Sequence, residues 1–165
     1  MSFVAGAYTA AYNGLALGKI EDGFTMSYRR FSETITTDVT GDAVQDGVYR
    51  GVQLTLSFVL SEWDATGAQA AFWPFSATFG KLGALGQLDT SLAKALVLTS
   101  CGTHNPDSIT FHLALLSPDF DVTQLFANRH RKIALQMSIY PVLATNPSST
   151  YGQCNELKLF TPVTT

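Results

Sequence analysis

The stretch that decides the fold is VYRGVQLTLSFVLSEWD, residues 48–64. Apolar side chains occupy every second position from Val52 to Leu60, which is the period of a β-strand with one buried face. The alternate positions carry an amide, hydroxyls and one valine, at Gln53, Thr55, Ser57, Val59 and Ser61. A strand face turned to water usually carries Lys, Glu or Arg. The sequence therefore predicts a long strand whose second face meets something other than bulk water.

Two later segments show the same pattern. The second face of 109–116 carries Thr110, His112, Ala114 and Leu116, opposite the apolar set Ile109, Phe111, Leu113 and Leu115. The second face of 132–140 carries Ala134, Gln136, Ser138 and Tyr140. Three strands with small, neutral second faces suggest a sheet whose outer side meets another protein surface or lines a confined neutral channel.

The chain is poor in charge for its length. Its 165 residues suffice for a single domain, expected over 1–165, with a substantial core. Charged residues make up only 14%, against roughly 25% in a typical soluble domain. A surface this poor in charge predicts a poorly soluble monomer and therefore a surface covered by other subunits. The net charge of −3 provides no basic field for nucleic acid or anionic lipid.

Signals for membranes and export are weak. No apolar run reaches the roughly 18–20 residues that span a membrane. The start of the chain, MSFVAGAYTAAYNG, lacks the basic residues of a signal peptide, so we expect the protein to remain in a cytoplasm. In that reducing compartment Cys101 and Cys154 are expected to be free thiols, with a disulfide between them the less favoured alternative.

Turn signals divide the chain into seven to nine expected strands, which predicts an all-β sandwich or barrel with one short helix. Tight turns are expected at Asn13-Gly14 and at Glu21-Asp22-Gly23. Within 24–36 the apolar positions change phase near Arg29-Arg30, which predicts a β-bulge. The expected strands are 3–11, 15–20, 24–36, 51–61, 92–100, 109–116, 132–140 and 153–161.

The short helix is expected over 62–73, directly after the central strand. Ser61 has the form of its N-cap, and Pro74 follows its end. Gly67 weakens the helix because glycine is a poor helix former. The glycines at 80, 83 and 86 predict an irregular loop or short hairpin over 76–91.

The sequence carries no motif for catalysis or for a cofactor, so we expect a protein that is not an enzyme and binds no metal. Cys101, His104 and His112 come nearest to a metal site but lack a fourth ligand. The aspartates at 38, 42 and 46 lack the spacing of a calcium loop and are expected at a solvated hairpin tip. The aromatic residues around the helix are expected to pack it on a sheet; the alternative is a sugar-binding platform built on Trp63, Phe72, Trp73 and Phe75.

The order of elements resembles a known family. A first strand and tight turn lead to a long hairpin with the polar tip TTDVTGDAVQDGVYRG (36–51). Its second strand, GVQLTLSFVLSEWD, ends in an acidic residue and leads into the short helix. Over residues 3–75 this resembles the tail tube proteins of long-tailed bacteriophages, whose relatives include contractile-tail tubes, tail terminators and distal tail proteins. The remainder resembles them only in its strand content.

The resemblance implies a β-sandwich or barrel of the tail-tube type and a structural virion protein. Such proteins form hexameric rings whose sheets join around a lumen, and the rings stack into a tube for DNA ejection. The implied partners are other copies, other tail proteins and phage DNA that passes without specific binding, and no membrane. The implied location is the virion tail, after assembly in the host cytoplasm.

Specific residues follow from the resemblance. The loop 36–51 would reach a neighbouring subunit or the next ring. The implied inter-subunit contacts are Asp38, Asp42 and Asp46 with Arg29, Arg30, Arg129 or Arg131. A lumen wall should be neutral or acidic so that it does not hold phosphate. The positions implied to face the lumen or a neighbouring subunit are Gln53, Thr55, Ser57, Gln136 and Ser138.

Other classes stay open at this point. The Gly-rich segment 76–91 departs from the simplest tube pattern and leaves a tail terminator or another ring-forming relative as an alternative. A jelly-roll capsid decoration protein and a carbohydrate-binding β-sandwich module are further alternatives. An enzyme on a barrel is the least favoured, since no convergent acid, base or metal set is present.

Overall fold

The computed structural model describes residues 8–39, 41–62, 64–101, 108–122, 132–142 and 159–163. Within these ranges the fold is all-β with one short helix, as the sequence predicted, plus a single helical turn, α2. The elements are β1 (Tyr8–Tyr12), β2 (Leu15–Ile35), β3 (Asp46–Leu60), α1 (Ala65–Phe72), α2 (Asp89–Leu92), β4 (Lys94–Ser100), β5 (Ser108–Leu116), β6 (Ile133–Tyr140) and β7 (Phe160–Val163).

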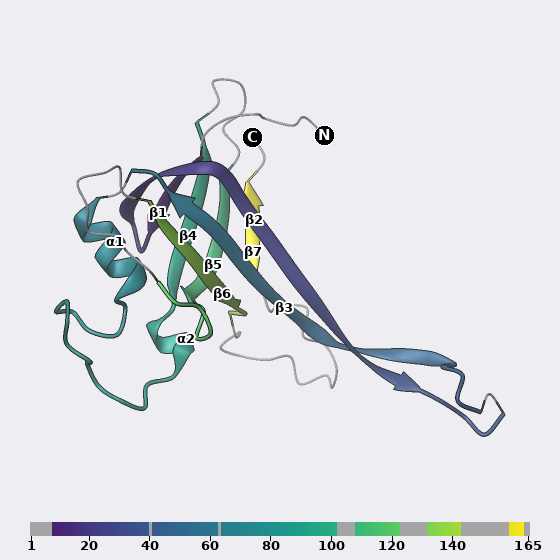
Figure 1. Ribbon diagram of the computed structural model, residues 1–165. Helices are drawn as coiled ribbons and strands as arrows, with labels where there is room; N and C mark the ends of the chain where they lie inside the picture. The colour runs from purple at the N-terminus through teal and green to yellow at the C-terminus, as the bar shows by residue number, and fades with distance from the viewer. Residues whose placement is uncertain are drawn as a thin grey trace.

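The sheet closes on itself as a barrel (Figure 1). Its antiparallel strands follow the order β4-β1-β2-β3-β6-β5, and β4 pairs again with β5. The second half of β5 pairs with β6, and its first half pairs on the same side with β7. Closure satisfies the backbone hydrogen bonds that an open sheet would leave at its edges.

Alternating side chains of the barrel wall form the core. The four inward residues of β3, from Leu54 to Leu60, are at most 4% exposed. Those of β6 lie opposite them, with Leu54 paired with Ile139 and Leu60 with Ile133. The predicted alternation is therefore confirmed in both strands. Each buried Leu or Ile contributes roughly 1.5–3 kcal/mol to stability by leaving water.

Tyr12 crosses the barrel interior. Its side chain is 1% exposed, and its hydroxyl donates a hydrogen bond of 2.9 Å to the backbone oxygen of Ala114 in β5. Burial raises the pKa of the Tyr12 hydroxyl to about 12, although a backbone hydrogen bond from Lys94 acts in the opposite direction. The bond satisfies a buried hydroxyl that would otherwise be costly to remove from water.

Asp64, not the expected Ser61, caps helix α1. Its side chain accepts hydrogen bonds of 3.0 Å from the backbone nitrogens of Thr66 and Gly67. The nitrogen of Ser61 bonds instead to the oxygen of Lys19, which keeps this part of the chain beside β2. The helix is therefore shorter than the predicted 62–73, because strand-like pairing with β2 extends past the end of β3.

Gly67 lets α1 approach the barrel closely. A Cβ atom at this position would lie 2.0 Å from the backbone oxygen of Ala16 in β2. Ala71, one turn further along, is fully buried in the same core as Tyr12 and Leu17. The helix thus covers the end of the barrel near the β1–β2 turn. The glycine that lowers helix propensity is required by this contact.

The expected turn at 21–23 is a bulge inside one strand of 21 residues. The register of β2 against β3 shifts between Glu21 and Phe24. Asp22 and Gly23 adopt positive φ values of 58° and 76°, a conformation that glycine, asparagine and aspartate tolerate best. The extra residues bend the chain without reversing it, so β2 continues outward.

The bulge expected near Arg29-Arg30 lies just beyond them, and its extra residue is on the partner strand β3. Pairing is continuous from Phe24 to Phe31, and the next register shift lies between Phe31 and Ser32, where Arg50 is the extra residue on β3. Phe31 and Ile35 therefore lie on the face opposite Tyr28. The apolar residues of β2 thus belong to two different faces of one regular strand, and β2 itself contains no phase change between Phe24 and Ile35.

The expected face assignment in 109–116 is wrong beyond Phe111. Phe111 and Ala114 both belong to the core, although they are three residues apart. The register of β4 against β5 shifts between Lys94 and Leu96, and this irregularity moves Ala114 inward. The alternation of apolar residues within β5 does not reveal this shift, because the shift arises from the pairing of β5 with β4.

Substituting Gly67→Ala tests the contact between α1 and β2. Helix propensity alone would stabilise the variant by about 1 kcal/mol. The clash with Ala16 should outweigh this gain and lower the free energy of unfolding by about 1–3 kcal/mol. Urea unfolding measures the difference, with the exposed Thr66→Ala as control. An unchanged or raised midpoint would contradict the close contact.

Substituting Tyr12→Phe should cost about 1 kcal/mol at pH 8 through the lost hydrogen bond to Ala114. The pKa of Tyr12 is raised from 10 to about 12, so the folded chain retains a proton that the unfolded chain releases. Tyr12 therefore stabilises the fold fully below pH 10 and loses this contribution as the pH rises towards 12. Urea unfolding of both proteins at pH 8 and pH 11 should show that the free energy of unfolding falls less in the variant than in the wild type. Equal losses would contradict this assignment.

Candidate assembly surfaces

The β2–β3 hairpin extends far beyond the barrel (Figure 1). Residues 54–60 of β3 pair with both β2 and β6, whereas residues 46–53 pair only with β2. We call residues 29–53 the arm: two strands joined by the loop 36–45. The loop is shorter than the predicted 36–51 tip, because β3 already begins at Asp46.

The arm exposes apolar side chains on both faces. Phe31 and Val48 lie on one face with exposed fractions of 40% and 47%, and Tyr49 lies on the other with 62%. At the tip Val39 and Val44 are 95% and 60% exposed. A two-stranded ribbon is at best marginally stable in water. Because both of its edges are unpaired within the described residues, the arm has the properties of a surface that another molecule covers.

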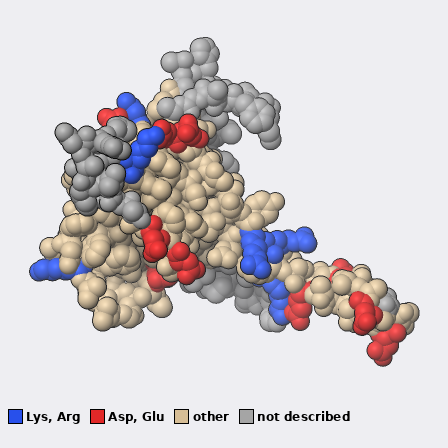
Figure 2. All heavy atoms as spheres, in the orientation of Figure 1, with Lys and Arg blue, Asp and Glu red and all other residues tan. Residues whose placement is uncertain are grey.

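Charge is separated along the arm (Figure 2). Arg29 and Arg30 lie at its root, and Asp38, Asp42 and Asp46 lie at its tip. A strand rises about 3.3 Å per residue, so the five steps from Arg30 to Ile35 alone span roughly 17 Å. These charges therefore cannot pair within one chain.

None of the ion pairs among the described residues joins the root arginines to the tip aspartates, although one of them lies within the arm. They join Lys19 to Glu62, Arg50 to Glu33, and Lys132 to Glu21. The Arg29 guanidinium lies 5.3 Å from the ring centre of Phe31, a cation–π contact. The other two predicted contact residues, Arg129 and Arg131, lie outside the described residues. The described members of the predicted set thus lie at a basic root and an acidic tip of the arm.

The predicted neutral positions gather on one outer face of β2, β3 and β6. Cross-strand pairing places Ser57 beside Gln136, and Thr55 beside Ser138. On the other side of β3, Thr25 lies beside Ser57 and Ser27 beside Thr55. The Ser138 hydroxyl also hydrogen-bonds that of Ser117 at 2.8 Å. We call this surface the neutral face; it consists of Thr25, Ser27, Gln53, Thr55, Ser57, Gln136 and Ser138.

Charges border the neutral face without entering it. The pair between Lys132 and Glu21, at 2.6 Å, lies at one end, and Arg29 lies beside Gln53 at the other. Side chains between these ends offer hydroxyls and amides. What the face meets remains a prediction, but the structure brings all five predicted positions together.

A second exposed apolar surface lies in residues 73–92, which we call the leucine loop. Leu82, Leu85 and Leu88 are 75–84% exposed. Sequence reasoning treated the segment only as a glycine-rich loop; the signal it missed is a leucine at every third position between glycines. Exposing three leucines to water is unfavourable, so this run indicates an interaction surface.

The leucine loop has a defined shape. The Trp73 indole nitrogen donates a hydrogen bond of 2.9 Å to the oxygen of Lys81, and its ring packs on Phe75 and Phe79. Gly83, with φ of +73°, lies so close that a Cβ atom would be 2.0 Å from the oxygen of Phe75. The ring of Trp73 is thus engaged by its neighbours, which does not favour a sugar platform. Trp63 lies outside the described residues.

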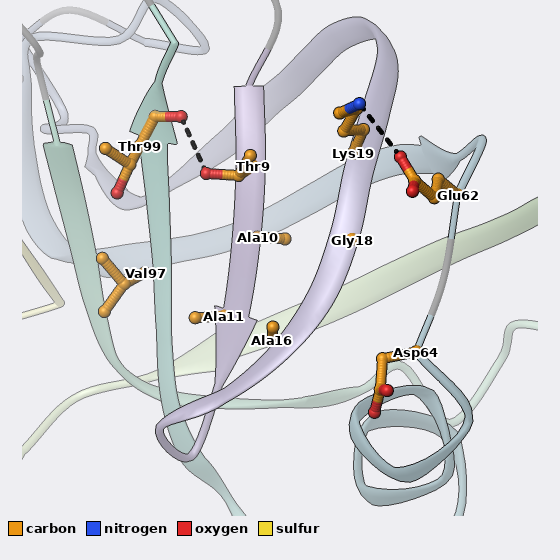
Figure 3. Close-up of a pocket in the computed structure, with 10 residues that line it drawn as sticks. All are labelled: Thr9, Ala10, Ala11, Ala16, Gly18, Lys19, Glu62, Asp64, Val97 and Thr99. Atoms are coloured by element: carbon orange, nitrogen blue, oxygen red, sulfur yellow. Dashed lines mark hydrogen bonds and ion pairs between the residues drawn. The ribbon is translucent and has the colours of Figure 1, made fainter.

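One cavity is a trough of about 590 Å³ on the outer side of β4, β1 and β2 (Figure 3). Its floor consists of small side chains, and its charged groups already have partners. Lys19 pairs with Glu62 at 3.1 Å, and Asp64 caps α1. The trough therefore holds no acid and base that converge on a free space, and it does not suggest catalysis.

The described part of the chain shows no group of three or more His, Cys, Asp or Glu placed to hold a metal ion. Cys101 is an exposed free thiol. Both His104 and Cys154 lie outside the described residues, and with them the arrangement of Cys101, His104 and His112 and the alternative disulfide. No helix of the described residues is long and apolar enough to cross a membrane.

No protein-family model and no curated protein sequence matches this chain. Among solved structures, the chain is similar to one in the cryo-EM structure of the anti-feeding prophage (AFP) baseplate, 6-fold symmetrised. The two share 13% sequence identity and a TM-score of 0.41, over 83% of this chain and 92% of that chain. A likeness at this level carries no argument about function.

Replacing Phe31 and Val48 together by serine tests the arm as an interaction surface. Both residues are partly exposed in the single chain, so the free energy of unfolding should change by only about 0.5 kcal/mol for each. Self-association should fall, because the arm loses apolar area. Sedimentation velocity and urea unfolding measure the two effects, with the buried Leu56→Ala, which should cost about 2–5 kcal/mol, as control. Unchanged association of the double variant would contradict this role.

Proposed function

We propose that this chain is a structural subunit of a phage tail, which assembles with copies of itself into hexameric rings stacked as a tail tube. The observation that carries this proposal is the arm. It is a two-stranded ribbon joined to a closed barrel, with exposed apolar residues on both faces and edges that no described residue pairs with. A barrel that folds by itself has no need of such an extension, but an assembly does.

The charges of the arm favour head-to-tail contact. A basic root and an acidic tip attract each other, and their separation requires that the partners come from different molecules. A contact between two different surfaces of identical subunits generates a ring when the rotation closes and a filament when it does not. The proposed inter-subunit residues are the tip aspartates Asp38, Asp42 and Asp46, with basic partners on a neighbour. Arg29, Arg30, Arg129 and Arg131 are the partners that the sequence resemblance implies.

The neutral face supports a role as a conduit. A wall of hydroxyls and amides attracts few phosphates, because DNA affinity arises mainly from Lys and Arg that displace counterions. A ring that directs this face inward would let DNA pass without specific binding. The low charge content and the net charge of −3 agree with this arrangement. We accordingly propose a virion tail location, assembly in the host cytoplasm, and contacts with other tail proteins.

Electron microscopy of the purified chain at high concentration, together with its mass in solution, tests the proposal. Stacked rings or tubes with a stain-filled channel are the expected result. A ring that never stacks would favour a tail terminator or another ring protein of the tail. A monodisperse monomer at every concentration would contradict self-assembly.

Deleting residues 38–46 tests the role of the arm in the same experiment. The described residues that the deletion removes are all exposed. The barrel should still fold, because β2 and β3 keep the rest of their pairing on the barrel side of the deletion. Tube growth should stop. The control replaces 38–46 by an equally long Gly/Ser segment, which retains the length of the loop but not its valines and aspartates. Tubes of normal length from the deleted protein would contradict the assignment.

A further inference from the structure

We propose that the leucine loop of one subunit is the receptor for the arm tip of another, so that Val39 and Val44 enter an apolar cleft beside Trp73 and the tip aspartates pair with Lys81 and Lys94. The inference rests on the self-assembly proposed above and names the receptor of the arm. It differs from the pairing with Arg29 and Arg30 that the sequence resemblance implies.

The receptor is a cleft of about 360 Å³ in the leucine loop. Its walls come from Trp73, Phe75, Leu82, Leu85 and Leu92. The hydrogen bond of Trp73 to Lys81 and the close approach of Gly83 to Phe75 hold these walls in place. A second hollow of about 560 Å³ adjoins the cleft, since it shares Trp73 and Leu92 and includes Lys94 in its lining. The cleft is thus apolar inside, with lysines at its border.

The tip of the arm has the complementary character. Its loop is closed by a hydrogen bond of 2.9 Å from the nitrogen of Gln45 to the oxygen of Ile35. Val39 is 95% exposed and Val44 60%, so each has apolar area left to bury. Residues 36–46 contain three aspartates and no basic residue. The tip is therefore an acidic surface that presents two small apolar side chains.

The lysines around the cleft have no ion-pair partner among the described residues. Between residues 65 and 100 the charged residues are Lys81, Asp89 and Lys94. Neither lysine belongs to an ion pair among the described residues, and the Asp89 carboxylate accepts a hydrogen bond of 2.9 Å from the Tyr140 hydroxyl. The lysines are exposed and available for the tip aspartates. Their attraction would set the orientation of the contact, and burial of the valines would supply most of its stability.

The arrangement of the fold requires that donor and receptor belong to different molecules. The arm leaves the barrel on one side, whereas α1 and the leucine loop lie on the opposite side (Figure 1). One chain therefore cannot insert its tip into its own cleft. A contact from one side of a subunit to the opposite side of the next repeats through the assembly, as a ring or a stack requires.

A charge exchange in the full-length chain tests the receptor. The cleft reversal, Lys81→Glu with Lys94→Glu, should weaken self-association at least tenfold in sedimentation experiments at low salt. Adding the tip reversal, Asp38→Lys with Asp42→Lys, should restore it. The root reversal, Arg29→Glu with Arg30→Glu, should gain nothing from the same tip reversal. All these positions are exposed in the single chain, and urea unfolding checks that each variant folds.

A matched pair of leucines tests the cleft itself. Leu85 lines the cleft and is 84% exposed, whereas Leu88 is 75% exposed but does not line it. Leu85→Ser should reduce association severalfold, and Leu88→Ser should change it little. Equal effects of the two substitutions would overturn the assignment of the cleft.

The outcomes separate this inference from the proposed function. If tubes form and the tip reversal is rescued by the root reversal, the arm binds the arginines and the inference is overturned while self-assembly stands. The same conclusion follows if the cleft reversal leaves assembly unchanged. A wild-type chain that stays monomeric at every concentration overturns both.

Discussion

The antiparallel ladder between β2 and β3 is longer than the barrel to which it belongs, and the rest of the structure depends on this difference in length. β6 covers β3 only from Leu54 onward, so the barrel wall uses seven residues of a strand of 15. The remaining ladder must project, because nothing else in the described residues pairs with it. Its two strands pair with each other, but among the described residues nothing pairs with their outer edges or covers their faces.

This projection explains how a chain with so few charges arranges them. Inside the barrel there is no room for charge, and the outer wall of β2, β3 and β6 carries almost none. Many of the described charges instead lie on the arm and beside the leucine loop. Salt bridges between exposed groups contribute little to the stability of a single chain. Placed at the borders of apolar surfaces, the same groups can determine which surface meets which.

Much of the fold follows from short patterns. The strict alternation in β3 and β6 predicted both strands and their buried faces, and the hydroxyl and amide positions of the neutral face followed from the same alternation. The misassignments share one cause. In sequence, the bulge at Asp22-Gly23 looks like a turn and Ser61 looks like a helix cap. In both places the structure depends on pairing with a distant segment, which the local sequence does not show. The leucine loop was missed because its residues follow no strand or helix period.

By itself the sequence determined the class of the fold, the buried faces of β3 and β6, and the neutral character of one outer face. These are local properties, since successive side chains of a strand point to opposite faces whatever the strand pairs with. Only the tertiary structure decided that the sheet closes, that β2 continues through its bulge, and that the arm and the leucine loop lie on opposite sides of the barrel. Register and closure depend on contacts between segments far apart in the chain, and no local pattern specifies them.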